Sequence, residues 1–200
     1  MSKGRLEAFG DAIIAIVITI MVLEFHAPES AELSALWPII PQFLAYVLSF
    51  LFLTIYWNNH HNLFHAVEQV NGAVLWANLH LMFWLSLVPF TTAWLSEAGL
   101  APAPVTLYGL VLFFAGMAYL LLLRSLVKLH GKQSPFALAI GRDTKGKLSL
   151  GLYGAGLLLG GWMPILAMAL YALIAILWLV PDRRFENALR LAQQSSNTPR

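Results

Sequence analysis

The chain has 200 residues, of which 59% are hydrophobic and only 11% are charged, and its formal net charge is +2. Soluble domains average about 45–50% apolar and about 25% charged residues, so this composition excludes an ordinary soluble fold and indicates a chain embedded in lipid. Cysteine is absent, which excludes disulfides, thiolate metal sites and thiol redox chemistry.

Six apolar segments come near the length of about 20 residues that a transmembrane helix needs. Connections rich in turn-forming residues separate them, and we predict membrane spans at residues 8–25, 37–57, 74–95, 105–123, 148–162 and 165–180. The predicted fold is therefore an all-α membrane protein with one six-helix transmembrane domain over residues 1–181. Residues 182–200 are polar, and we expect a cytoplasmic tail whose end is disordered.

The distribution of charge supports the count of six. With six spans, both termini and the second and fourth loops share one side of the membrane, and all 12 Lys and Arg residues fall on that side. The opposite side carries Glu24, Glu29, Glu32 and Glu97 and no cation. Lys and Arg in short loops favour the cytoplasm, so we predict a multi-pass protein of the cell (inner) membrane with both termini cytoplasmic.

The first predicted helix is unusual because carboxylates bracket it closely. Twelve residues separate Asp11 from Glu24, a rise of about 18 Å, whereas the hydrocarbon core is about 30 Å thick. A lipid-facing helix of this kind would draw two carboxylates into hydrocarbon, which is costly. A central position with water on one side suits the helix better than a peripheral one.

One stripe of this helix consists of Ile16, Thr19, Ile20 and Leu23, which recur at helical spacing. Asp11 lies off the stripe and should point toward neighbouring helices. Periodicity alone favours core packing, because most apolar stripes simply pack. The alternative is a hydrophobic constriction with one ring of hydroxyl groups, which can gate an ion pathway by dewetting.

Three motifs in order resemble one known family. Residues 5–11, Arg-Leu-Glu-Ala-Phe-Gly-Asp, resemble the Arg-x-x-x-Phe-Ser-Asp signature of the transmembrane protein 175 family of lysosomal and bacterial potassium channels. Residues 12–24 are similar to the remainder of that family's first helix, residues 56–64 to the end of its second helix, and residues 78–92 to its third. Gly10 departs from the pattern, since the family usually has Ser there, and a hydroxyl hydrogen bond is lost.

The resemblance implies a potassium-permeable cation channel, assembled as a homotetramer in the bilayer, with no cofactor, bound metal or nucleic-acid partner. The first helix of each subunit would line the pore without a re-entrant selectivity loop, with Ile16 as the main constriction and Thr19, Ile20 and Leu23 also in the pore. Selectivity for potassium over sodium would be modest, because no carbonyl filter sequence is present. An intrasubunit network would hold the first helix, formed by Arg5, Phe9, Asp11, Trp57, His60 and Asn78, with His60 as a candidate partner of Asp11.

Other functions remain open. The six histidines and Asp11 suggest a proton-conducting channel on the same scaffold. His61, His65 and Glu68 share a helix face at metal-ligand spacing, as an intramembrane metal-dependent enzyme would require, although a structural role is favoured and no His-Glu-x-x-His motif is present. A secondary transporter is disfavoured because no matching pair of broken helices is found. We predict that the chain is not an enzyme.

Overall fold

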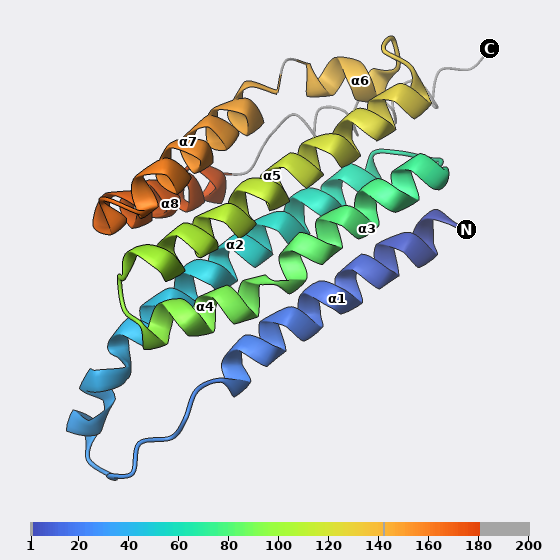
Figure 1. Ribbon diagram of the computed structural model, residues 1–200. Coiled ribbons are helices and arrows are strands. Elements are labelled where there is room, and N and C mark those ends of the chain that lie inside the picture. Colours follow the sequence, from blue (N-terminus) through green and yellow to red (C-terminus); the bar gives the residue numbers. More distant parts are fainter. Residues whose placement is uncertain (1, 142, 181–200) are drawn as a thin grey trace.

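The computed structural model describes residues 2–141 and 143–180, and these residues form a helical bundle without β-strands (Figure 1). The elements in chain order are α1 (Lys3–Leu23), the 3-10 helix η1 (Leu33–Ile39), α2 (Ile40–His65), α3 (Gly72–Ser86), α4 (Val88–Glu97), α5 (Pro102–His130), α6 (Pro135–Ile140), α7 (Thr144–Gly160) and α8 (Pro164–Leu179). The predicted tail at 182–200 lies outside the described residues.

Four of the helical segments are long and apolar enough to cross a membrane, namely Lys3–Leu23, Leu33–His65, Gly72–Glu97 and Pro102–His130. The prediction of an all-helical membrane protein is therefore confirmed. The last two helices are shorter, with 17 residues in α7 and 16 in α8. The count of six spans stays a prediction.

The boundaries differ from the predicted ones for local physical reasons. The third predicted span is divided into α3 and α4 next to Pro89, whose nitrogen has no hydrogen to donate to the preceding turn. α2 and α5 continue beyond their predicted ends at 57 and 123 into more polar residues, which the predicted apolar spans had excluded. The short α6 lies in a segment predicted as a connection, and the Ser134 hydroxyl caps it by accepting a hydrogen bond from the Ala137 amide.

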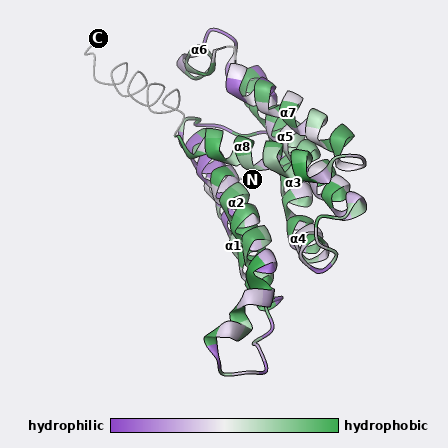
Figure 2. Ribbon diagram, turned by 90° about the vertical axis from the view of Figure 1, so that its left-hand side faces the viewer, coloured by the Kyte–Doolittle hydropathy of each residue, from purple (hydrophilic) through white to green (hydrophobic). Residues whose placement is uncertain are grey.

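Successive long helices run in alternating directions, so the N-terminus, the α2–α3 connection and the α5–α6 connection lie at one end of the bundle (Figure 1). Hydrophobic residues cover most of the helix lengths, and hydrophilic residues gather toward helix ends and connections (Figure 2). This distribution is that of a bundle whose middle section lies in lipid.

Two hydrophobic clusters hold the bundle together. One joins α1, α2, α3, α5 and α6 together with Val88 at the start of α4, and the other joins α2, α4, α5, α7 and α8. Glycines permit the closest approaches: a Cβ atom at Gly156 on α7 would overlap the Tyr171 ring on α8, and one at Gly160 would lie 2.8 Å from the Thr106 hydroxyl on α5. The Gly-x-x-x-Gly pair therefore serves helix packing.

Candidate functional site

The first helix has one buried and one exposed face. The buried stripe, at helical spacing, consists of Leu6, Gly10, Ile14, Val17 and Met21. It packs against α2, α3 and α4. The opposite stripe is apolar yet open, with Ile16 58% exposed, Ile20 41% and Leu23 72%. Within the described part of the chain, the stripe predicted to line a pore is thus left uncovered by the subunit's own helices.

Thr19 also lies on the exposed stripe, where its hydroxyl donates a hydrogen bond of 2.9 Å to the Ala15 carbonyl of the preceding turn. The donor is used within the helix, so only the oxygen lone pairs and the methyl group of Thr19 can meet a neighbour or an ion. Ile18 faces the other way and packs, partly buried, against the first hydrophobic cluster.

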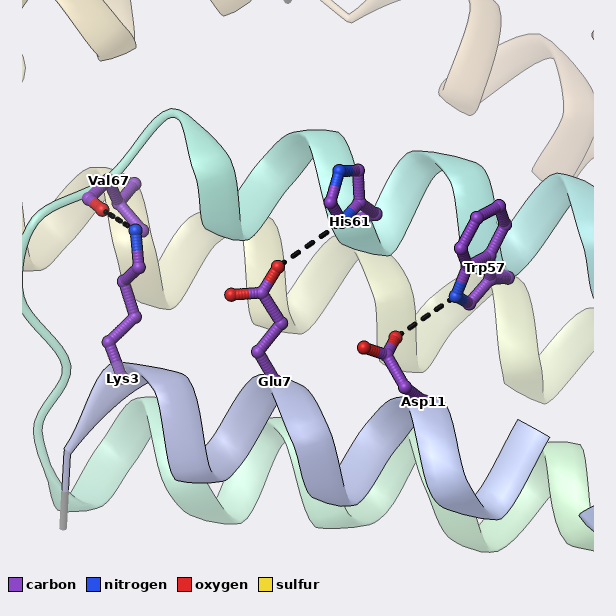
Figure 3. A network of polar contacts seen from close by, with 6 residues as sticks. All are labelled: Lys3, Glu7, Asp11, Trp57, His61 and Val67. Atoms are coloured by element: carbon purple, nitrogen blue, oxygen red, sulfur yellow. Dashed lines mark hydrogen bonds and ion pairs between the residues drawn. The ribbon is translucent and has the colours of Figure 1, made fainter. Parts of the chain in front are cut away.

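Three polar contacts join α1 to α2 and to the connection that follows it, and we refer to them as the α1–α2 polar row (Figure 3). The Lys3 ammonium donates to the Val67 carbonyl at 2.9 Å, Glu7 Oε1 lies 3.2 Å from His61 Nδ1, and the Trp57 indole N–H donates to Asp11 Oδ1 at 3.0 Å.

The spacing of the α1–α2 polar row follows helix geometry. Lys3, Glu7 and Asp11 are four residues apart and therefore lie on one face of α1. On α2, the Trp57 and His61 rings stack with centroids 5.8 Å apart and an interplanar angle of 19°. The regular spacing on α1 and the stacked rings on α2 thus stabilise the contacts between the two helices, and these contacts fix the position of one helix along the other.

A second contact lies deeper, beneath the polar row. His60 Nε2 is 2.7 Å from Asn78 Oδ1, which joins α2 to α3, and both side chains are fully buried. A Cβ atom at Gly10 would lie only 2.9 Å from His60 Cε1. The glycine in place of the family Ser therefore lets α1 approach the imidazole, whose Nδ1 has no hydrogen-bond partner among the described residues.

The structure brings together two pairs of the predicted network, Asp11 with Trp57 and His60 with Asn78. The expectation that His60 would partner Asp11 is wrong, because the imidazole is turned inward to Asn78 and the indole takes its place. Arg5 is exposed and has no ion pair among the described residues, and Phe9 is 45% exposed. The structure therefore does not join these two side chains to either pair.

Sequence reasoning missed Lys3 and Glu7 as contacts of α1, although their spacing with Asp11 was a usable signal. Polar residues at every fourth position of an otherwise apolar helix mark a face that needs partners. His61 was considered only with His65 and Glu68 as a metal site. In the described part of the chain, no group of three or more His, Asp or Glu residues is placed to hold a metal ion.

Comparison with known proteins agrees with these features. The profile of the family described as endosomal/lysosomal potassium channel TMEM175 matches residues 5–89. A potassium channel of Chryseobacterium sp. (strain P1-3) is 46% identical over 190 residues, which cover 95% of this chain and 99% of that protein. The endosomal/lysosomal proton channel TMEM175 of Danio rerio is 28% identical over 142 residues, covering 68% of this chain but only 26% of that longer protein.

The fold has a solved counterpart as well. The crystal structure of a lysosomal potassium-selective channel TMEM175 homolog from Chamaesiphon minutus superposes with a TM-score of 0.76 at 27% identity, covering 89% of this chain and 96% of that one. The relationship predicted from residues 5–92 is thus confirmed and extends along nearly the whole chain. The chain belongs to the TMEM175 family of ion channels and not to a family of enzymes.

Proposed function

We propose that this protein is a potassium-permeable cation channel whose pore is lined by α1 of each subunit. The observation that carries the proposal is the open stripe of α1, in which Ile16 and Leu23 are 58% and 72% exposed while the other face of the same helix is buried. In a membrane protein such a stripe must meet lipid, another subunit or a pore. The carboxylates of Asp11 and Glu24, which bracket the stripe, disfavour lipid.

A ring of Ile16 side chains would form the constriction, with Thr19, Ile20 and Leu23 along the same pathway. An apolar ring excludes water when it is narrow, and the resulting loss of hydration is the barrier to an ion. Discrimination between potassium and sodium should be modest, because an apolar ring does not replace the hydration shell with oxygen ligands. The two hydrogen-bonded pairs, Asp11 with Trp57 and His60 with Asn78, would hold α1 in place behind this ring.

One α1 helix cannot enclose a pore, so the proposal requires a closed ring of subunits, and we propose a homotetramer. The family relationship supports this assembly, and the uncovered face of α1 is the surface that it would use. Native mass spectrometry in mild detergent and in nanodiscs should show tetramers. Monomers alone under both conditions would contradict the assembly.

The same proposal places both termini and the α5–α6 connection in the cytoplasm of a cell whose inner membrane holds the protein. The absence of cysteine makes labelling clean, and Gln133 is exposed in that connection. A cysteine introduced at Gln133 should react with a membrane-impermeant maleimide only after the cells are opened. Labelling of Gln133→Cys in intact cells would contradict the proposed orientation and indicate the opposite one.

Ion conduction itself is tested by recording from the purified protein in planar bilayers while potassium is replaced by sodium or by a large organic cation. We expect passive currents whose reversal potential moves with the potassium gradient. Because vertebrate relatives are named proton channels, the same recordings should include a proton gradient at equal potassium. A reversal potential that follows only pH would favour a proton channel on this scaffold.

A further inference from the structure

A basic hollow apart from α1 is lined by residues from the C-terminal half of α5, the short α6 and the start of α7. Figure 1 shows where these three helices lie. Its volume is about 670 Å³, and its lining includes four cations, Arg124, Lys128, Lys132 and Lys147. All four are exposed and have no ion pair among the described residues. This concentration of positive charge would attract an anion from outside the described part of the chain.

The described lining contains one carboxylate, which offsets only one of the four positive charges. Asp143 is the N-cap of α7, and its Oδ1 accepts a hydrogen bond of 3.3 Å from the Gly146 amide. The nearby Lys145 is directed elsewhere, since its ammonium donates to the Val180 carbonyl at 2.9 Å and lies 4.5 Å from the Trp178 ring centroid. The hollow is thus positive on balance.

The lining changes character along α5. The apolar Leu120 and Leu123 come first along α5. From Arg124 onward cations alternate with apolar residues such as Val127, and Lys132 lies in the connection beyond the helix. From Leu120 to Lys128 the helix rises about 12 Å. An apolar wall that leads from the lipid-embedded part of a helix into a cluster of cations matches a molecule with an anionic headgroup and a hydrocarbon chain. A small soluble anion would leave that apolar wall without a partner.

The position of the hollow favours the same ligand. Its lining includes the last turns of α5, at the end of the bundle that also holds the N-terminus and where the proposed topology puts the lipid headgroups. The adjoining α6 exposes the apolar Leu138. Basic pockets at this level between transmembrane helices bind anionic lipid headgroups. We infer that the hollow binds an anionic phospholipid, with its phosphodiester among the four cations and an acyl chain along Leu120 and Leu123.

The test uses native mass spectrometry of the full-length protein in detergent, titrated with phosphatidylglycerol or with phosphatidylcholine of the same acyl chains. We expect bound phosphatidylglycerol to exceed phosphatidylcholine in the wild type. The triple variant Arg124→Gln, Lys128→Gln and Lys132→Gln should lose about fivefold in affinity for each charge removed, and so about a hundredfold in total. These side chains are exposed, and unchanged elution on size exclusion would confirm that the variant is folded.

The matched control removes three charges that are described and lie outside the lining, in the variant Lys3→Gln, Arg5→Gln and Lys145→Gln. It should keep the preference for phosphatidylglycerol. Equal loss in both variants would mean general attraction to positive charge and would overturn the inferred site, as would wild-type binding in the first variant. Inorganic phosphate and glycerophosphoglycerol, added in a hundredfold excess, should fail to displace the lipid. Displacement by either one would identify a site for soluble anions instead.

Discussion

The Trp57 indole N–H donates a hydrogen bond of 3.0 Å to Asp11 Oδ1, which ties the first helix to the second beside the face proposed to line the pore. The indole also stacks on His61, which in turn contacts Glu7. The pair formed by Asp11 and Trp57 thus connects the family signature on α1 with the stacked aromatic rings on α2. Its physical role can be tested without reference to ion flow.

Asp11→Ala should lower the thermal stability of the assembled protein, because the indole loses its acceptor at the membrane edge. Asp11→Asn should cost less, since an amide oxygen can still accept. In a double-mutant cycle with Trp57→Phe we expect a coupling of about 0.5–1.5 kcal/mol, measured by the loss of oligomer on heating. Strictly additive effects would show that the hydrogen bond contributes nothing. Arg5→Gln is a suitable comparison, and only a small change is expected for an exposed side chain.

Gly10 provides a second test, in which alanine and serine variants differ by one hydroxyl group. Either substitution places a Cβ atom 2.9 Å from His60 Cε1, so the imidazole must shift and both variants begin with a steric cost. Only Ser can offer a hydrogen bond to His60 Nδ1, which has no partner among the described residues. We therefore expect Gly10→Ser to be more stable than Gly10→Ala by about 1 kcal/mol in thermal denaturation. Equal stability of the two variants would mean that the hydroxyl does not reach the ring.

Ile16 and Ile18 separate the exposed and packed faces of α1. Ile16→Asn should wet the proposed constriction, raise open probability or conductance severalfold, and weaken discrimination between potassium and sodium. Ile18→Asn should mainly reduce expression and stability, because Ile18 packs against the hydrophobic cluster and the amide would be buried without a partner. Single-channel recording and expression yield measure both effects. If both variants express equally poorly and the surviving channels keep wild-type selectivity, the pore lies elsewhere.

Two glycines of α7 test the packing of the last helices. Gly156→Ala should cost about 1–3 kcal/mol, because its Cβ would overlap the buried Tyr171 ring. Gly151→Ala, in the same helix, meets no atom within 4 Å and should be neutral or slightly stabilising, since Ala favours the helix. Thermal denaturation followed by size exclusion compares the two. Equal destabilisation would show that α7 does not depend on close contact with α8.

The sequence by itself determined the environment of the protein and the internal geometry of each long helix. The high apolar fraction indicated that the chain is embedded in lipid. The residues that share a face of α1 follow from 3.6 residues per turn, whatever surrounds the helix. The stripe containing Ile16 and Leu23 could therefore be identified, and so could the relationship carried by Arg5, Phe9 and Asp11. Local chemistry also explains the division at Pro89, although the sequence prediction had treated that span as continuous.

Only the tertiary structure decided which side chains meet across helices. Asp11 contacts Trp57 while His60 turns to Asn78, whereas the sequence analysis had favoured His60 as the partner of Asp11. The choice depends on how far α2 is shifted along its axis and rotated about it. That position results from the packing of whole apolar faces and from the close approach at Gly10, a sum over many contacts that no local pattern encodes.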